Sequence, residues 1–91
     1  MKKAVRLNIT GNLQSLFFRQ FIKEHAEKCN MKGYLRILED GKVEIFLQGE
    51  HEELEEMINI CKAGPKHSVI RNVDVKEERL QDFKDFKVLN F

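Results

Sequence analysis

The segment 34–47 constrains the fold more than any other part of this 91-residue chain. Two β-prone runs, residues 34–38 and 43–47, flank a short polar segment that contains Asp40-Gly41. Asp-Gly is the preferred central pair of a tight type I′ turn, because both central residues of that turn need a positive φ. The sequence therefore predicts an antiparallel hairpin that closes through such a turn.

The segments before the hairpin show two different apolar periods. Residues 4–10 alternate between apolar and polar side chains, which predicts a strand with one buried face, and Gly11 is expected to end it. From about Phe18 to Cys29 the apolar residues recur at helical intervals. The first half of the chain is thus predicted as strand, helix and hairpin.

After the hairpin the same two periods return. Gly49 is expected to end the second hairpin strand, and residues 50–62 have the apolar spacing of a helix that stops at Gly64-Pro65. Residues 69–75 alternate and predict a strand. A loop over 76–81 and a final short strand over 86–89 complete the expected elements, with Phe83 and Phe91 closing the sheet edge.

The order of these elements predicts an α+β fold. Two βαβ-type units with crossover helices place both helices on one face of an antiparallel sheet. We therefore expect a ferredoxin-like sandwich, βαββαβ plus a short terminal strand, which forms a single domain over residues 1–91.

Composition excludes several classes of function. The net charge is +1, with 16 basic and 15 acidic residues interspersed, so no basic surface for a nucleic acid is expected. No apolar run is long enough to span a membrane, and the start of the chain lacks a signal-peptide core. We expect a cytoplasmic monomer without a nucleic-acid or membrane partner.

The cysteines and histidines give no sign of a metal site. Cys29 and Cys61 lie far apart in the sequence among apolar residues at helical spacing, so we interpret them as reduced core thiols. His25, His51 and His67 show no metal-ligand spacing with either cysteine. No metal and no cofactor are expected.

The segment 11–19, which joins the first strand to the first helix, is the candidate site. A helix N-terminus has free backbone N–H groups that can bind an anion. Arg19 is expected in the first helical turn, where a cation opposes the helix macrodipole at a cost of about 0.3–1 kcal/mol. A bound phosphate or carboxylate would offset that cost. Alternatively, Arg19 points into water or pairs with a nearby acid.

This segment resembles the acylphosphatase signature G-x-V-Q-G-V-x-F-R. It matches at Gly11, Gln14, Phe18 and Arg19, with Leu13 and Leu16 as apolar replacements. Residues 33–36 resemble the family's G-W-V-R, and residues 38–44 its L-x-D-G-x-V-E. Gly49, Gly64-Pro65 and Phe86-Lys87-Val88 also fall where the family has them, so the resemblance covers essentially the whole chain.

The resemblance implies hydrolysis of a carboxyl-phosphate anhydride without a metal or cofactor. In that family the loop amides and the arginine hold the phosphoryl group, while an asparagine on the second strand orients the attacking water. Carried over by position, Arg19 is the clamp. The amides of the cradle are those of Gln14, Ser15, Leu16, Phe17 and Phe18.

Two departures from the family pattern bear on activity. The asparagine falls at Ile37, whose side chain has no hydrogen-bonding atom. Losing one well-placed polar group in a catalytic site costs roughly 10²–10³ in rate. Ser15 stands where the motif has a glycine, which often supplies a backbone conformation or a close approach. We therefore expect phosphate or acyl phosphate binding with weak or lost hydrolysis.

Two other functions stay open on the sequence. One is an active acylphosphatase in which a backbone carbonyl or Ser15 positions the water. The other is a ferredoxin-like binding module such as an RNA-recognition domain, since Lys32-Gly33-Tyr34 resembles the start of an RNA-binding strand. That segment lies on the second strand rather than the third, and aliphatic residues follow where stacking aromatics would be wanted.

Overall fold

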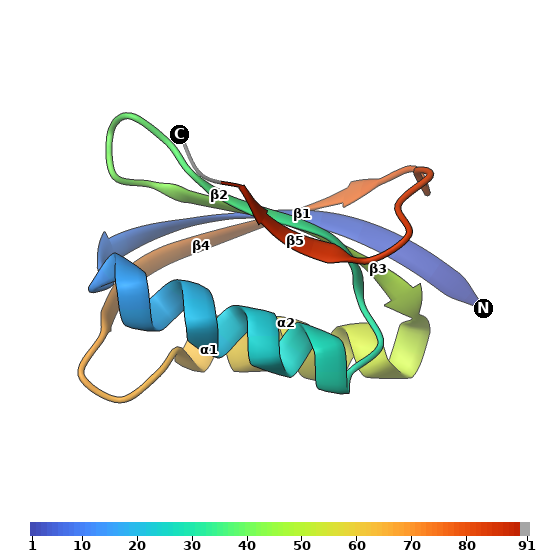
Figure 1. The fold of residues 1–91 in the computed structure, drawn as a ribbon, viewed down its shortest axis with the longest axis horizontal. Helices are drawn as coiled ribbons and strands as arrows, with labels where there is room; N and C mark the ends of the chain where they lie inside the picture. The colour runs from blue at the N-terminus through green and yellow to red at the C-terminus, as the bar shows by residue number, and fades with distance from the viewer. Residues whose placement is uncertain (90–91) are drawn as a thin grey trace.

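Two helices cover one face of a five-stranded sheet in the computed structural model, which describes residues 1–89 apart from the side chain of Ser15 (Figure 1). The strands lie in the order β4-β1-β3-β2-β5. The predicted ferredoxin-like α+β fold is confirmed. The elements in chain order are β1 (Lys2–Asn12), α1 (Ser15–Lys28), β2 (Lys32–Ile37), β3 (Val43–Glu50), α2 (His51–Ala63), β4 (Val69–Glu78) and β5 (Phe86–Leu89).

The four longer strands pair antiparallel, as the element order predicts. The terminal strand β5 is different, because it pairs with β2 in the parallel direction, with Gly33 opposite Phe86 and Leu35 opposite Val88. Strand β5 forms one edge of the sheet and the long strand β4 forms the other. Both helices lie on the same side, below the sheet in Figure 1.

The core lies between the sheet and the helices. Alternate residues of the strands, such as Leu7 and Ile9, point toward the helices and are fully buried. From α1, Phe18 and Ile22 meet them, and α2 adds a stripe of its own. Burying each of these side chains stabilises the fold by about 1.5–3 kcal/mol. The buried residues of α2 are Leu54, Met57, Ile58 and Cys61.

The hairpin between β2 and β3 forms as predicted, but the predicted turn type is wrong. The Leu38 N–H donates to the Lys42 carbonyl at 2.8 Å, and the Gly41 N–H donates to the Leu38 carbonyl at 3.0 Å. Gly41 has a φ of 84°, whereas Asp40 does not have a positive φ. This is a three-residue loop with one left-handed glycine rather than a type I′ turn. The Asp40 carboxylate accepts the Lys42 N–H at 3.0 Å, which favours the observed geometry.

Two glycines that were expected to end strands lie inside them. Strand β1 continues past Gly11 to Asn12 through a register shift between Thr10 and Gly11. Strand β3 continues through Gly49, which pairs with Lys3 of β1. Pairing with β1 overrides the local preference of glycine in the second case, and a bulge accommodates it in the first.

Strand β4 is longer than predicted. Residues 76–78 were expected to belong to a loop because they are polar, yet Lys76 lies opposite Arg6 and Glu78 lies opposite Ala4. An edge strand with one solvent-exposed face can carry charged residues, so the polar composition of this segment does not end the strand.

The face of the sheet away from the helices carries a cluster of aromatic rings. The rings of Tyr34 and Phe46 stack with centroids 5.9 Å apart, and Phe83 contacts both at 5.8 and 5.2 Å. Two hydrogen bonds between Gln48 and the Gln81 backbone, at 2.7 and 2.8 Å, hold the connection to β5 over this face. Phe83 thus covers a face instead of closing the sheet edge. Phe91 lies outside the described residues.

Both cysteines are buried free thiols, which confirms their place in the core. Burial raises the pKa of Cys61 to about 12, with a smaller contribution from Cys29. Both thiols are therefore protonated and unreactive near neutral pH. Within residues 1–89, neither helix has the length and apolar character needed to cross a membrane.

Candidate functional site

The loop between β1 and α1 lies at the end of the sheet where β2 stops and β3 starts. Ile9 of β1 and Ile37 of β2 are both paired with Val43 of β3, on its two sides. Strand β1 then runs two residues beyond Thr10 before the loop. The predicted cradle and Ile37 are therefore brought to one end of the sheet, although they are far apart in the sequence.

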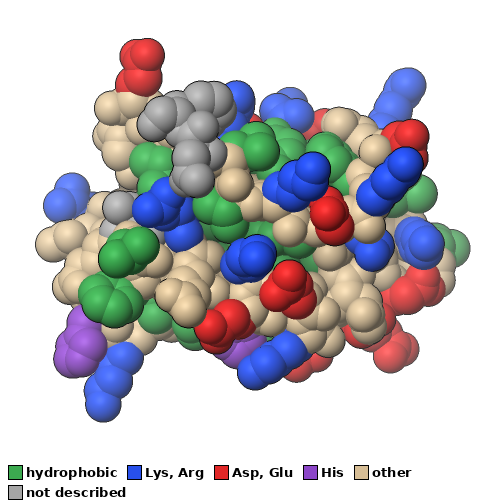
Figure 2. Space-filling view, in the orientation of Figure 1, with side chains coloured by type: hydrophobic (Ala, Val, Ile, Leu, Met, Phe, Trp, Pro, Cys, Tyr) green, Lys and Arg blue, Asp and Glu red, His purple; other side chains and the backbone are tan. Residues whose placement is uncertain are grey.

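Two buried side chains anchor the loop on either side of its exposed part. Leu13 is 5% exposed and Phe18 is fully buried in the core. Between them, Leu16 is 64% exposed and Phe17 is 67% exposed. Figure 2 shows hydrophobic side chains at the surface over the N-terminal end of α1, at the left of the view. The backbone of residues 14–17 is consequently held at the surface.

Gly11 sits where only a glycine fits. Its φ is +152°, and a Cβ added there would lie 2.1 Å from the carbonyl oxygen of Val69. Because β1 and β4 approach so closely at this point, the loop leaves β1 in a fixed direction. The glycine that matches the start of the family signature thus has a steric role.

Gln14 begins α1 in a left-handed conformation, with φ 50° and ψ 73°. Its carbonyl oxygen accepts the N–H of Phe17 at 3.0 Å and of Phe18 at 3.2 Å. These two amides of the predicted cradle therefore already have an acceptor in the helix. The N–H groups of Ser15 and Leu16 precede those bonds, and a helix start leaves such groups to acceptors outside the helix.

Arg19 lies in the second turn of α1 rather than the first, because the helix begins at Ser15 and not near Phe18. Leu16 and Phe17 are exposed and do not belong to the buried stripe of the helix, which starts at Phe18. The apolar period therefore placed the start of the helix too late. Residues four apart share one side of a helix, and long helical side chains lean toward the N-terminus. Arg19 is thus on the same side of α1 as Ser15.

A groove beside the loop includes apolar and cationic groups, and Glu24 and Glu27 add carboxylates to it. Leu16 and Arg19 line it from α1, and Val88 lines it from β5. Its volume is about 460 Å³.

The position of Arg19 in the second turn of α1 also removes most of the expected dipole penalty, since the dipole effect falls off within the first turn.

Ile37 is the last residue of β2 and is partly buried against the core. It shares the helix-facing side of β2 with Leu35, two residues earlier. Neither Asn30 nor Asn72 lies beside Ile37: Asn30 follows the far end of α1, where its side chain donates to Glu53, and Asn72 lies within β4, which β1 and β3 separate from β2. Asn12 does lie at the loop, as the last residue of β1.

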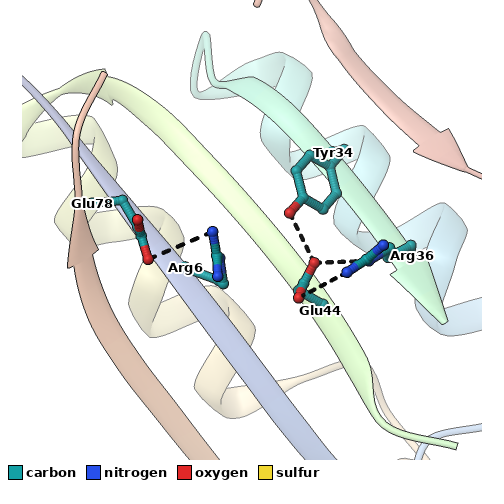
Figure 3. A network of polar contacts seen from close by, with 5 residues as sticks. All are labelled: Arg6, Tyr34, Arg36, Glu44 and Glu78. Carbon is teal, nitrogen blue, oxygen red and sulfur yellow. Dashed lines mark hydrogen bonds and ion pairs between the residues drawn. The ribbon is translucent and has the colours of Figure 1, made fainter. Parts of the chain in front are cut away.

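A second polar cluster surrounds Glu44 on the face away from the helices (Figure 3). Glu44 is 7% exposed, and its carboxylate accepts hydrogen bonds from the Tyr34 hydroxyl at 2.8 Å and from Arg36 Nε at 2.8 Å. Arg36 Nη2 donates to its second oxygen at 3.3 Å. Arg6 lies nearby and pairs with Glu78 at 3.6 Å.

The charge of Glu44 is stabilised by these donors. Burial alone would raise the Glu44 pKa, but the hydrogen bonds from Arg36 and Tyr34 and the charges of Arg36 and Arg6 outweigh it and lower the pKa. The pKa of Tyr34 is raised by burial and by its bond to Glu44. Sequence reasoning missed this cluster, although the polar positions of the hairpin pattern pointed to it. The Tyr34 and Arg36 donors are used within the cluster, which indicates a structural role, whereas the buried Arg6 Nε has no hydrogen-bond partner among the described residues.

Comparisons with known proteins identify the family and agree with the fold. The family model for acylphosphatase matches residues 5–88. The chain is 33% identical over 85 residues to an acylphosphatase of Archaeoglobus fulgidus. The aligned region covers 93% of this chain and 96% of that protein. A crystal structure of Bacillus subtilis acylphosphatase superposes with a TM-score of 0.90 at 27% identity, covering 99% of this chain and 100% of that one.

A larger protein contains a similar unit. Full-length HypF in its phosphate- and nucleotide-bound form superposes with a TM-score of 0.90 at 33% identity. The match covers 99% of this chain and 12% of HypF. The fold of this chain therefore also occurs as one part of a much longer chain.

Proposed function

Because this chain belongs to the acylphosphatase family, we propose that it binds phosphate or an acyl phosphate at the N-terminal end of α1 and hydrolyses carboxyl-phosphate anhydrides weakly or not at all. The observation that carries the binding half is a helix start with exposed residues, followed one turn later by Arg19. The observation that carries the catalytic half is Ile37 at the same end of the sheet.

The binding half rests on main-chain N–H groups and one guanidinium. The amides of Ser15 and Leu16 would donate to phosphoryl oxygens, and the positive end of the α1 dipole favours the anion by about 0.3–1 kcal/mol. Arg19, on the same side of the helix, would add charge-assisted bonds with bidentate geometry. The amides of Phe17 and Phe18 complete the proposed cradle only if their bonds to Gln14 lengthen.

The catalytic half concerns the attacking water. In hydrolysis the water oxygen forms a bond to phosphorus, the bond from phosphorus to the carboxyl oxygen breaks, and the carboxylate leaves with the electron pair. Catalysis of such a transfer is mostly positioning and charge stabilisation. The Ile37 side chain offers no atom that could hold a water, so the site would bind the phosphoryl group without aligning its nucleophile. No metal or cofactor enters the proposal.

The same proposal includes a cytoplasmic monomer without a nucleic-acid partner. The net charge of +1 provides little attraction for a polyanion. On the face away from the helices Phe46 is fully buried, so this ring cannot stack on a base. Size-exclusion chromatography would test the oligomeric state.

The test compares binding with turnover in the same samples. Calorimetry with inorganic phosphate is expected to give a dissociation constant of about 1 mM or lower. Hydrolysis of acetyl or benzoyl phosphate is expected to be close to the uncatalysed rate. Arg19→Ala should abolish measurable phosphate binding, whereas Arg79→Ala, at an exposed arginine after β4, should leave it unchanged.

Two results would contradict the proposal. Turnover of acyl phosphates by the wild-type protein at the rates of intact family members would show that another group positions the water. If that turnover disappeared in Arg19→Ala, the chain would be an active acylphosphatase with a substitute group. Phosphate binding that is the same in Arg19→Ala and the wild type would instead move the anion site away from α1.

A further inference from the structure

Two residues in left-handed conformations meet beside the candidate site. Within residues 1–89, the non-glycine residues with positive φ are Gln14, Asn30 and His67, at 50°, 57° and 74°. Asn30 follows the end of α1, where a left-handed residue is a regular way to terminate a helix. Gln14 and His67 have no such explanation. The Gln14 Nε2 atom donates to the His67 carbonyl oxygen at 3.3 Å, across 53 residues.

His67 belongs to a tightly bonded turn, residues 64–68, between α2 and β4. The Ser68 hydroxyl and the Ser68 N–H both donate to the Pro65 carbonyl, at 2.7 and 3.2 Å. Gly64 begins this turn with a φ of +69°, and a Cβ there would lie 2.6 Å from Ile70 Cδ1. The turn is therefore fixed on both sides, by its own hydrogen bonds and by close packing.

The β1–α1 loop contacts this turn and the strand after it at two points. Gly11 packs against the Val69 carbonyl at the start of β4, and Gln14 reaches the His67 carbonyl. Between the two points the chain has only Asn12 and Leu13. The conformation of Gln14 thus depends on a segment that follows it by about fifty residues.

We propose that the Gln14 side chain is a positioning group, which holds the anion loop to the turn 64–68 and does not itself bind phosphate. The proposal rests on the proposed function. Left-handed backbone at a non-glycine residue persists only where the surroundings impose it. The side-chain bond to His67 supplies that restraint, and the resulting direction of the chain turns the Ser15 and Leu16 amides outward. Without the bond, the Gln14 backbone would leave the left-handed conformation, and the Ser15 and Leu16 N–H groups would no longer point toward the same anion.

The first test replaces Gln14 by methionine, which has a similar length but no N–H donor. Phosphate binding in Gln14→Met is expected to weaken about three- to tenfold, the range for losing one neutral hydrogen bond. Gln20→Met is the matched control, because Gln20 on α1 also donates one exposed bond at 3.3 Å, to Glu24. It should leave phosphate affinity unchanged. Thermal midpoints of all variants separate lost binding from lost folding.

A double-mutant cycle distinguishes positioning from direct contact. Ser68→Ala removes the 2.7 Å bond to Pro65 and loosens the turn without touching the loop. It is expected to weaken phosphate binding about two- to threefold in the wild-type background and by less than about 1.5-fold in Gln14→Met, because coupled residues are not additive. Equal effects of Ser68→Ala in both backgrounds, or none in the wild type, would overturn the proposal.

The cycle separates failure of this inference from failure of the proposed function. If the wild type binds phosphate and Arg19→Ala does not, while Gln14→Met binds normally, the positioning role alone is wrong. If the wild type does not bind phosphate, the proposed function itself is wrong. Should Gln14→Met fold poorly, Ser68→Ala in the wild-type background still provides the decisive measurement.

Discussion

Asparagine at position 37 is expected to restore hydrolysis. The Ile37→Asn variant should turn over acetyl phosphate at least tenfold faster than the wild type, because a single polar group that positions a reactant is worth roughly 10²–10³ in rate. The end of β2 already places position 37 on the helix side of the sheet, at the end where the loop lies. Release of phosphate, followed by a colorimetric assay at saturating substrate, measures the change.

The substitution also has a cost in stability that can be estimated from its surroundings. Ile37 is only partly buried, so removing its apolar surface should destabilise the fold by about 1 kcal/mol, or half of the value for a fully buried side chain. For a chain of this size that corresponds to a thermal midpoint lower by about 4–8 °C. The variant should therefore remain folded at 25 °C, where the rate is measured.

Leucine at the same position is the matched control, since its branched side chain has nearly the shape of asparagine without polar atoms. Ile37→Leu should show no gain in turnover. If Ile37→Asn were folded, bound phosphate as the wild type does and yet were no faster than Ile37→Leu, the reasoning about the missing water-positioning group would be refuted. The loss of activity would then have to come from the loop itself, for example from Ser15.

Three changes elsewhere test the structural reasoning. Glu44→Gln should lower the free energy of unfolding at pH 7 by about 1–2 kcal/mol in urea titrations, because a charged acceptor is replaced by a neutral one. The Glu44 pKa is lowered from its ordinary value of 4.5, so this difference should be fully present above that pH and should shrink as the pH falls below it; a constant difference would contradict the assignment. Gly33→Ala should unfold the protein or cost about 3 kcal/mol or more, because φ is +140° and a Cβ would lie 1.9 Å from the Phe46 carbonyl oxygen. Gly41→Ala, at φ +84° in open space, should cost only about 1–2 kcal/mol in the same assay, and equal costs would refute the steric argument.

Burial explains which parts of the fold could be predicted from the sequence. The strands and helices follow from residues such as Leu7 and Ile22, whose spacing matches the face that packs into the core. The start of α1 could not be found this way, because Leu16 and Phe17 are apolar and yet exposed. The parallel pairing of β5 with β2 was also beyond prediction, since four residues carry no pattern that selects a neighbour.

Some features of the candidate site could likewise be predicted from the sequence, and others could not. Residues 11–19 are adjacent in the chain, so their motif was visible, and the position of Ile37 follows from the strand order once the hairpin is known. The contact between Gln14 and His67 depends on a bulge after Thr10 and on a left-handed backbone at a histidine, and neither leaves a recognisable mark in the sequence. A motif thus supplies the groups that could bind an anion, but the direction of those groups is imposed by a distant turn. It follows that grafting residues 11–19 onto another strand–helix junction should reproduce the composition of the site without its geometry.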